Sequence, residues 1–67
     1  MISEREKEVL ENISRGFTAK EIANKLFLSC HTIISHRKSL YLKLEATNSA
    51  QLVYQGIKHG YIQIEEY

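Results

Sequence analysis

Four helix-start signals divide this 67-residue chain into short segments. The signals are small polar residues of the type that caps a helix N-terminus, namely Ser3, Thr18, Ser29 and Asn48. The first two are followed three positions later by a glutamate, which completes a capping box. No proline interrupts the segments in between. The sequence therefore predicts an all-α domain whose helices cover about 4–14, 19–26, 30–44 and 49–59.

The second and third of these segments have the spacing of a helix-turn-helix. If Ala23 is the small residue where the two helices cross, apolar residues should lie one position before it and three, five and ten positions after it. Those positions hold Ile22, Leu26, Leu28 and Ile33. The turn itself contains Phe27, where many such turns have a glycine. The order of the elements predicts a helix-turn-helix over 19–44.

Length and composition favour one small globular domain over residues 1–67. One cysteine allows no internal disulfide, and no Cys/His spacing suits structural zinc. No apolar run is long enough for a membrane span, and no signal peptide is recognisable. We expect a cytoplasmic protein with no membrane association, no metal and no cofactor. Catalysis is not expected, because no nucleophile–base pair or paired carboxylates stand out.

Positive charge is concentrated in the third segment. Residues 29–48 contain three basic residues, Arg37, Lys38 and Lys43, and a single acidic residue, whereas the net charge of the whole chain is only +1. Two histidines lie in the same stretch. This distribution indicates an anionic partner.

A helical wheel separates two sides of the segment 30–44. At 100° per residue, Ile33, His36, Leu40 and Leu44 share one side, which we expect to face the core. His31, Ile34, Ser35, Lys38 and Leu42 share the opposite side. Ile34 is thus predicted to point away from the core although its neighbour Ile33 points inward. The outer side is the one that could enter a DNA major groove.

Several short motifs occur in order along almost the whole chain. They are RE-x-EVL at 5–10, Gly16, KEIA at 20–23, LFLS at 26–29, Thr32–Ile33, His36, KL at 43–44, NSAQLV at 48–53 and GYI at 60–62. In this combination the chain resembles the LuxR/GerE-type helix-turn-helix output domain of bacterial transcription regulators. The resemblance implies a four-helix fold that binds promoter DNA and, in many members, is attached to a receiver or sensor domain.

The resemblance also implies roles for individual residues. Its base-contacting positions correspond to Ile34, Ser35 and Lys38. Its phosphate-contacting positions correspond to Lys20, Thr32 and Lys43, and the wheel places His31 and Arg37 near enough to the same surface to join them. The predicted function is sequence-specific binding of double-stranded DNA by the segment 30–44, with RNA polymerase as a further expected partner.

The segment 49–59 has an apolar sector wider than one core contact needs. Leu52 and Gly56 lie at one edge, which we expect to face the core. The resemblance implies dimers formed through this helix, and the rest of the sector suggests a weak homodimer face, formed on DNA, that consists of Ala50, Val53, Tyr54 and Ile57. In the tail, 61–67, we expect Tyr61 and Ile62 to dock on the domain.

Three positions depart from the family pattern. Basic residues are usual or frequent in the family at 34, 42 and 49, and this chain has Ile34, Leu42 and Ser49. The departures favour one alternative, a helix-turn-helix that serves as a protein-interaction or dimerisation module with weak or no DNA binding. A second alternative is a promoter-recognition domain like that of a sigma factor, which shares the pattern EIA…L…S…T found between 21 and 32.

Overall fold

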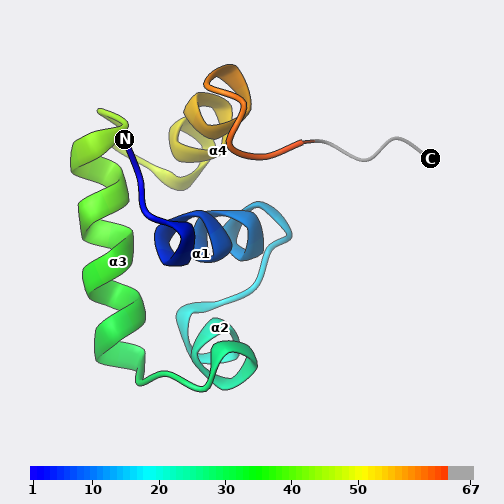
Figure 1. Ribbon diagram of the computed structural model, residues 1–67, viewed down its shortest axis with the longest axis vertical. Coiled ribbons are helices and arrows are strands. Elements are labelled where there is room, and N and C mark those ends of the chain that lie inside the picture. The colour runs from blue at the N-terminus through cyan, green and yellow to red at the C-terminus, as the bar shows by residue number, and fades with distance from the viewer. Residues whose placement is uncertain (64–67) are drawn as a thin grey trace.

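The computed structural model describes residues 1–63 and consists of four helices joined by short turns (Figure 1). The helices are α1 (Glu4–Ser14), α2 (Ala19–Leu26), α3 (Cys30–Lys43) and α4 (Ser49–Lys58). The predicted all-α fold is confirmed, and only the ends of α3 and α4 differ from prediction, each by one residue. The rest of the tail segment, 64–67, lies outside the described residues.

Each helix begins at the predicted cap. The side-chain oxygens of Ser3, Thr18, Ser29 and Asn48 accept the backbone N–H of the third helical residue at 2.9–3.2 Å. In α1 and α2 the capping box is complete, because Glu6 and Glu21 accept the backbone N–H of the cap residue at 2.9 and 2.8 Å. These contacts are local in sequence, which is why four residues predicted the start of every helix.

The ends of the helices could be predicted from the sequence less well than their starts. Gly16 and Gly60 have positive φ angles of 87° and 78°, as expected for glycines that stop a helix. Phe27 and Glu45 adopt the same left-handed conformation, with φ angles of 57° and 54°. At Glu45 the N–H of Ala46 bonds to the carbonyl of Tyr41 at 3.0 Å, which closes α3. Because residues other than glycine rarely adopt this conformation, the sequence offered no stop signal there.

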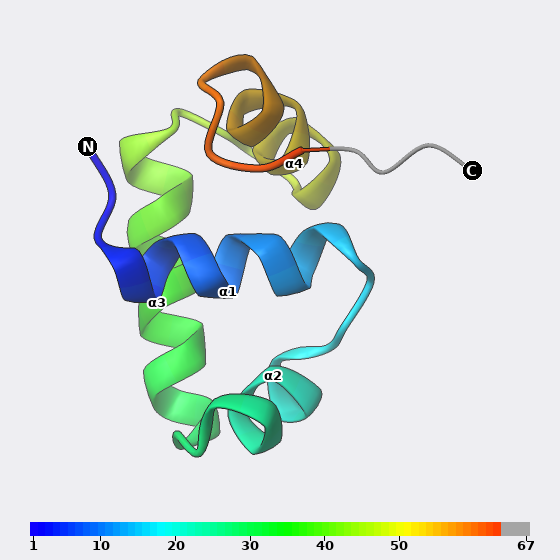
Figure 2. The same cartoon turned by 45° about the vertical axis from the view of Figure 1, so that its right-hand side comes forward.

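α1 lies at the centre of the domain and contacts the other three helices (Figure 2). It runs across α3, with α4 above it and α2 below it in that view. Of the residues predicted to face the core from the segment 30–44, Ile33, Leu40 and Leu44 are buried, whereas His36 is only half-buried. The fully buried large side chains of the core are Val9, Leu10, Ile22, Ile33, Leu40 and Leu52. The helix-turn-helix is therefore braced from one side by α1.

The close approach of α4 to α1 requires Gly56. A Cβ atom at this position would lie 2.9 Å from Cδ2 of Leu10 and 3.1 Å from Cδ1 of Ile62. Ile62 is buried and belongs to the core, and Tyr61 packs against it, so the predicted docking of both residues is confirmed. None of the helices within residues 1–63 has the length and apolar character needed to cross a bilayer.

Candidate nucleic-acid interface

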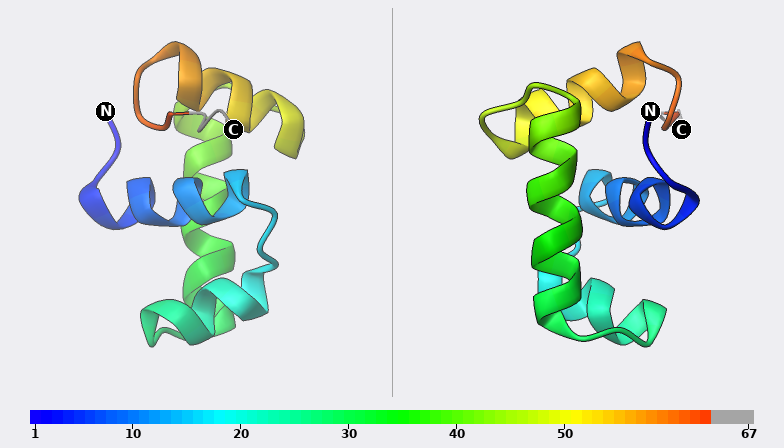
Figure 3. Two further views of the ribbon diagram at one scale, coloured as in Figure 1. Left: turned by 90° about the vertical axis from the view of Figure 1, so that its right-hand side faces the viewer. Right: turned by 60° about the vertical axis from the view of Figure 1, so that its left-hand side comes forward.

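One side of α3 is covered by the rest of the domain and the other side is open. α1, α2 and α4 all lie on the same side of α3 when the molecule is viewed from several directions (Figures 1 and 3). On the covered side Ile33, Leu40 and Leu44 are buried. The open side, as the wheel predicted, consists of the exposed residues His31, Ile34, Ser35, Lys38 and Leu42.

The three predicted base-contacting residues lie together on this open side. Ser35 and Lys38 are exposed, and within residues 1–63 neither side chain forms a hydrogen bond or ion pair. Ile34 keeps 37% of its surface exposed and is absent from the hydrophobic cluster that forms the core. All three are therefore available to a partner that approaches α3 from outside the domain.

The start of α3 is fixed by a pair of hydroxyls. The Ser29 hydroxyl oxygen accepts the backbone N–H of Thr32 at 3.1 Å, and the two side-chain hydroxyls are 2.9 Å apart. Thr32, predicted to contact phosphate, is half-buried beside this cap. The free backbone N–H groups of the first turn and the helix dipole make this end of α3 the more favourable end for a negative charge.

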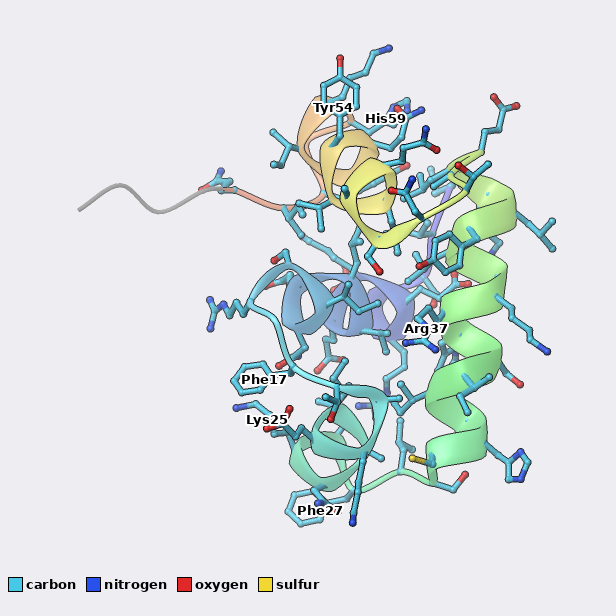
Figure 4. The ribbon with its side chains drawn as sticks, turned by 180° about the vertical axis from the view of Figure 1, so that it is seen from behind. Phe17, Lys25, Phe27, Arg37, Tyr54 and His59 are labelled. Atoms are coloured by element: carbon cyan, nitrogen blue, oxygen red, sulfur yellow. The ribbon has the colours of Figure 1, made fainter. Side chains whose placement is uncertain are left out.

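The predicted phosphate contacts lie in different surroundings. Lys20 is exposed in the first turn of α2, and His31 is exposed in the first turn of α3. Arg37 is half-buried and its side chain lies along the edge of α3 nearer to α1 (Figure 4). Lys43 is different, because its ammonium group already has a carboxylate partner in the domain, Glu6. Its assignment to phosphate stays a prediction.

Glu6 is a buried carboxylate whose role the sequence did not reveal. It is only 4% exposed. Besides the Ser3 backbone N–H, its oxygens accept the Ser39 hydroxyl at 2.6 Å and the Lys43 ammonium at 2.9 Å. Burial alone would raise the pKa of Glu6, but the Ser3, Ser39 and Lys43 contacts together lower that pKa from 4.5 to about 2. Glu6 thus ties the start of α1 to the covered side of α3.

A signal for this burial was present in the sequence. Glu6 precedes Val9, Leu10 and Ile13 by three, four and seven residues, which is the spacing of one helix face. Because the capping box already accounted for a glutamate at this position, the spacing was not used to predict that Glu6 is buried. Its partners are 33 and 37 residues away, so the periodicity could place Glu6 against the core without identifying what it meets there.

α4 divides its wide apolar sector between the core and the surface. Leu52 and Gly56 are buried, as predicted for the inner edge. Val53 and Ile57 are half-buried and pack partly against the core, whereas Ala50 is exposed and Tyr54 is 64% exposed. Figure 4 shows Tyr54 pointing away from α1. The predicted dimer face is therefore only partly free for a second copy.

Comparisons with known proteins agree with this geometry. Residues 1–55 match the family model described as bacterial regulatory proteins, luxR family. "Oxygen regulatory protein NreC" of Staphylococcus carnosus (strain TM300) is 38% identical over 58 residues, and that of Staphylococcus haemolyticus (strain JCSC1435) is 36% identical. These segments represent 87% of this chain but only 27% of those proteins.

A solved structure has the same fold. The crystal structure of the response regulator ChrA, from a heme-sensing two-component system, superposes with a TM-score of 0.88 at 31% identity. The superposition covers 92% of this chain and 31% of ChrA. The chain thus spans about a third or less of the length of the relatives it matches.

Proposed function

Because the chain belongs to the luxR family of bacterial regulatory proteins, a family of DNA-binding transcription regulators, we propose that it binds double-stranded DNA sequence-specifically through the open side of α3. The observation that carries the proposal is the exposed set on α3 that has no partner within residues 1–63, Ser35 and Lys38 above all. A major groove admits one helix, and side chains on its open side then reach base edges.

Ile34, Ser35 and Lys38 are the proposed base contacts. Lys20, Thr32, His31, Arg37 and Lys43 are the proposed phosphate contacts. Lys38 suits a guanine edge, which offers two acceptors in the major groove, whereas phosphate contacts set the register of the helix without reading sequence. The Glu6–Lys43 ion pair supports this docking, because it ties α3 to α1 at 2.9 Å.

In the whole protein the domain would act as the output part of a transcription regulator. The matched relatives include a response regulator and are several times longer than this chain, which supports an attached input domain. RNA polymerase is then a proposed further partner. With few exposed cations on α3, a single copy is expected to bind weakly, and pairing would add affinity.

Pairing is proposed through α4, with Ala50, Val53, Tyr54 and Ile57 at the contact. Two-fold pairing would present two copies of α3 to half-sites about one DNA turn apart. Because Val53 and Ile57 also pack on the core, Tyr54→Asp is the better test. It should reduce two-to-one binding on a duplex with two half-sites and leave one-to-one binding intact, as sedimentation would measure. Unchanged two-to-one binding would rule out this face.

Salt dependence tests DNA binding directly. If about three to five phosphates are neutralised, a plot of log K against log salt should have a slope of about −3 to −5. Lys20→Ala should weaken binding to all duplexes alike and make the slope shallower by about 1. Lys58→Ala, which removes an exposed lysine at the end of α4, is the matched control and should change neither.

A protein-interaction module is the second candidate, favoured by one observation. Leu42 is 81% exposed on the same open side as Ile34, so two apolar side chains occupy positions where a DNA-binding face would gain from cations. A gel-shift assay with random duplex at low salt separates the two candidates. Retarded duplex supports DNA binding, and no retardation at any protein concentration supports the interaction module.

A further inference from the structure

Ile34 exposes an apolar side chain where the fold does not need one. Its neighbour Ile33 is completely buried, whereas Ile34 is 37% exposed and is not one of the buried residues that form the core cluster. The core therefore does not account for this isoleucine. A lysine or glutamine at the same place would fit an α-helix at least as well.

The position of Ile34 on α3 is that of a base reader. It lies in the second turn, one residue before Ser35 and four before Lys38, on the open side. Recognition helices use their N-terminal residues to reach base edges. Leu42 lies eight residues further on, about 12 Å along the helix axis at 1.5 Å per residue, near the end of α3. Of the two exposed apolar residues, only Ile34 belongs to the base-reading part.

The chemistry of isoleucine limits what it could recognise. Its side chain can neither donate nor accept a hydrogen bond, so it gains nothing from phosphate or from a guanine edge. The one apolar group in the major groove is the 5-methyl group of thymine. Because isoleucine in a helix is almost confined to one χ1 rotamer, its methyl groups are held in place and lose little entropy on contact.

We infer that Ile34 packs against the 5-methyl group of a thymine and thereby directs the domain to half-sites with an A·T pair at that position. The inference rests on the DNA binding proposed above. It also accounts for the missing cation at position 34, because Ile34 exchanges general affinity for discrimination at one base pair. Lys38, one turn further on, then reads the neighbouring part of the site.

The experiment begins with duplexes that the 67-residue chain selects from a random-sequence pool. Each thymine is then replaced in turn by deoxyuridine, which differs only in lacking the 5-methyl group. At one position of the half-site the parent should lose about fourfold in affinity, which corresponds to one methyl group no longer buried. At the other positions the loss should be absent.

Three variants assign that loss to Ile34. Ile34→Ala should bind thymine and deoxyuridine duplexes equally. Ile34→Lys should also ignore the methyl group. At about 0.1 M salt one added phosphate contact should raise its affinity about eightfold for the deoxyuridine duplex, but only about twofold for the matching thymine duplex, because the methyl contact is lost. Leu42→Lys is the matched control, since it adds the same charge on the same side of α3. It should gain general affinity and keep the fourfold methyl effect.

The outcomes separate this inference from the proposed function. If the parent selects and binds duplexes but is indifferent to every thymine-to-deoxyuridine exchange, Ile34 does not read thymine although DNA binding stands. The same conclusion follows if Ile34→Ala keeps the methyl effect. If the pool yields no enriched duplex and the parent binds none, sequence-specific binding and the inference fail together. Thermal unfolding of each variant confirms that it is folded.

Discussion

The covered side and the open side of α3 contain the same three residue types in different surroundings. On the covered side Leu40 is fully buried, and Ser39 and Lys43 both bind the carboxylate of Glu6. The open side also has a leucine, a serine and a lysine, namely Leu42, Ser35 and Lys38. They are exposed, and the serine and lysine form no hydrogen bond or ion pair with the part of the chain that the structure describes.

The difference lies in what packs against each side. α1 crosses the covered side and brings the buried side-chain carboxylate of Glu6 to within 3 Å of the Ser39 hydroxyl and the Lys43 ammonium. Within residues 1–63 no other helix crosses the open side (Figure 3). The same residue type therefore stabilises the fold on one side and is available to a partner on the other. Matched substitutions on the two sides should separate stability from binding.

Of the matched pairs, Leu40 and Leu42 should differ most in their effect on the free energy of unfolding. Leu40→Ala removes a fully buried side chain and should lower the free energy of unfolding by about 2–5 kcal/mol. Leu42→Ala removes a side chain that is mostly in water and should change it by no more than about 0.5 kcal/mol. Urea unfolding followed by circular dichroism measures both. A destabilisation of similar size in the two variants would mean that the open side is not open in solution.

Low pH should destabilise the fold because it protonates Glu6, which binds the covered side of α3. Its pKa is lowered from 4.5 to about 2 in the folded protein, so the ionised carboxylate stabilises the fold above about pH 4.5, and this stability is lost as pH falls through about 2. The full effect is on the order of 3 kcal/mol. Glu6→Gln should remove most of this acid dependence in thermal unfolding curves recorded between those pH values.

Glu21→Gln is the control for that experiment. Glu21 occupies the equivalent place in the capping box of α2, and hydrogen bonds with Thr18 also lower its pKa, but it is exposed and within residues 1–63 its side chain forms no hydrogen bond or ion pair with α3. Its replacement should leave most of the acid dependence in place. If Glu21→Gln flattens the curve as much as Glu6→Gln does, the capping boxes and not the contact with α3 are responsible.

Replacing Lys43 should mainly reduce stability, whereas replacing Lys38 should mainly reduce DNA binding. Lys43→Met removes the cation beside a buried carboxylate and should cost about 1–3 kcal/mol of stability. Lys38→Met should leave stability unchanged and weaken binding to selected duplexes by about 1–3 kcal/mol if it reads a guanine. Unfolding and duplex titration of both variants provide the four measurements. Loss of DNA affinity in a stably folded Lys43→Met would support the predicted phosphate contact.

Of the matched pairs, Ser39 and Ser35 should differ least in their effect on stability. Ser39→Ala removes one hydrogen bond to the Glu6 carboxylate and should destabilise the domain by about 1 kcal/mol. Ser35→Ala removes no side-chain hydrogen bond within the residues that the structure describes. It should leave the unfolding midpoint in urea unchanged or slightly higher, since alanine favours a helix more than serine. A lower midpoint for Ser35→Ala would contradict the proposed division of α3.

Much of the fold could be predicted because its signals are local. A cap residue and its glutamate are three positions apart, and the two sides of α3 follow from 100° per residue. The ends of α3 and α4 were predicted one residue too late. α3 ends at Lys43, and the left-handed conformation that follows it is adopted by Glu45, where no glycine signals a helix end. Val53 and Ile57 were assigned to a free face and instead pack partly against the core.

Phe27 is the clearest feature that sequence reasoning missed. It closes α2 in the left-handed conformation and is 94% exposed, so neither the backbone nor the core favours an aromatic residue there. In Figure 4 it lies at the α2 end of the domain, on the same side as Phe17, whose ring lies under Lys25 at 4.2 Å. The turn position was recognised from its spacing, but not its exposure, which depends on what packs around it.

The sequence by itself determined the four helices, the family, and which residues of α3 face outward, because capping, periodicity and motif spacing act over a few residues. Only the tertiary structure decided which polar residues are engaged within the domain. The sequence predicted Glu6 as part of a capping box and Lys43 as a phosphate contact, and only the fold showed that the two side chains also meet at 2.9 Å across 37 residues. A contact over that separation depends on how α1 crosses α3. No local pattern encodes that crossing, because it results from packing all the buried side chains together.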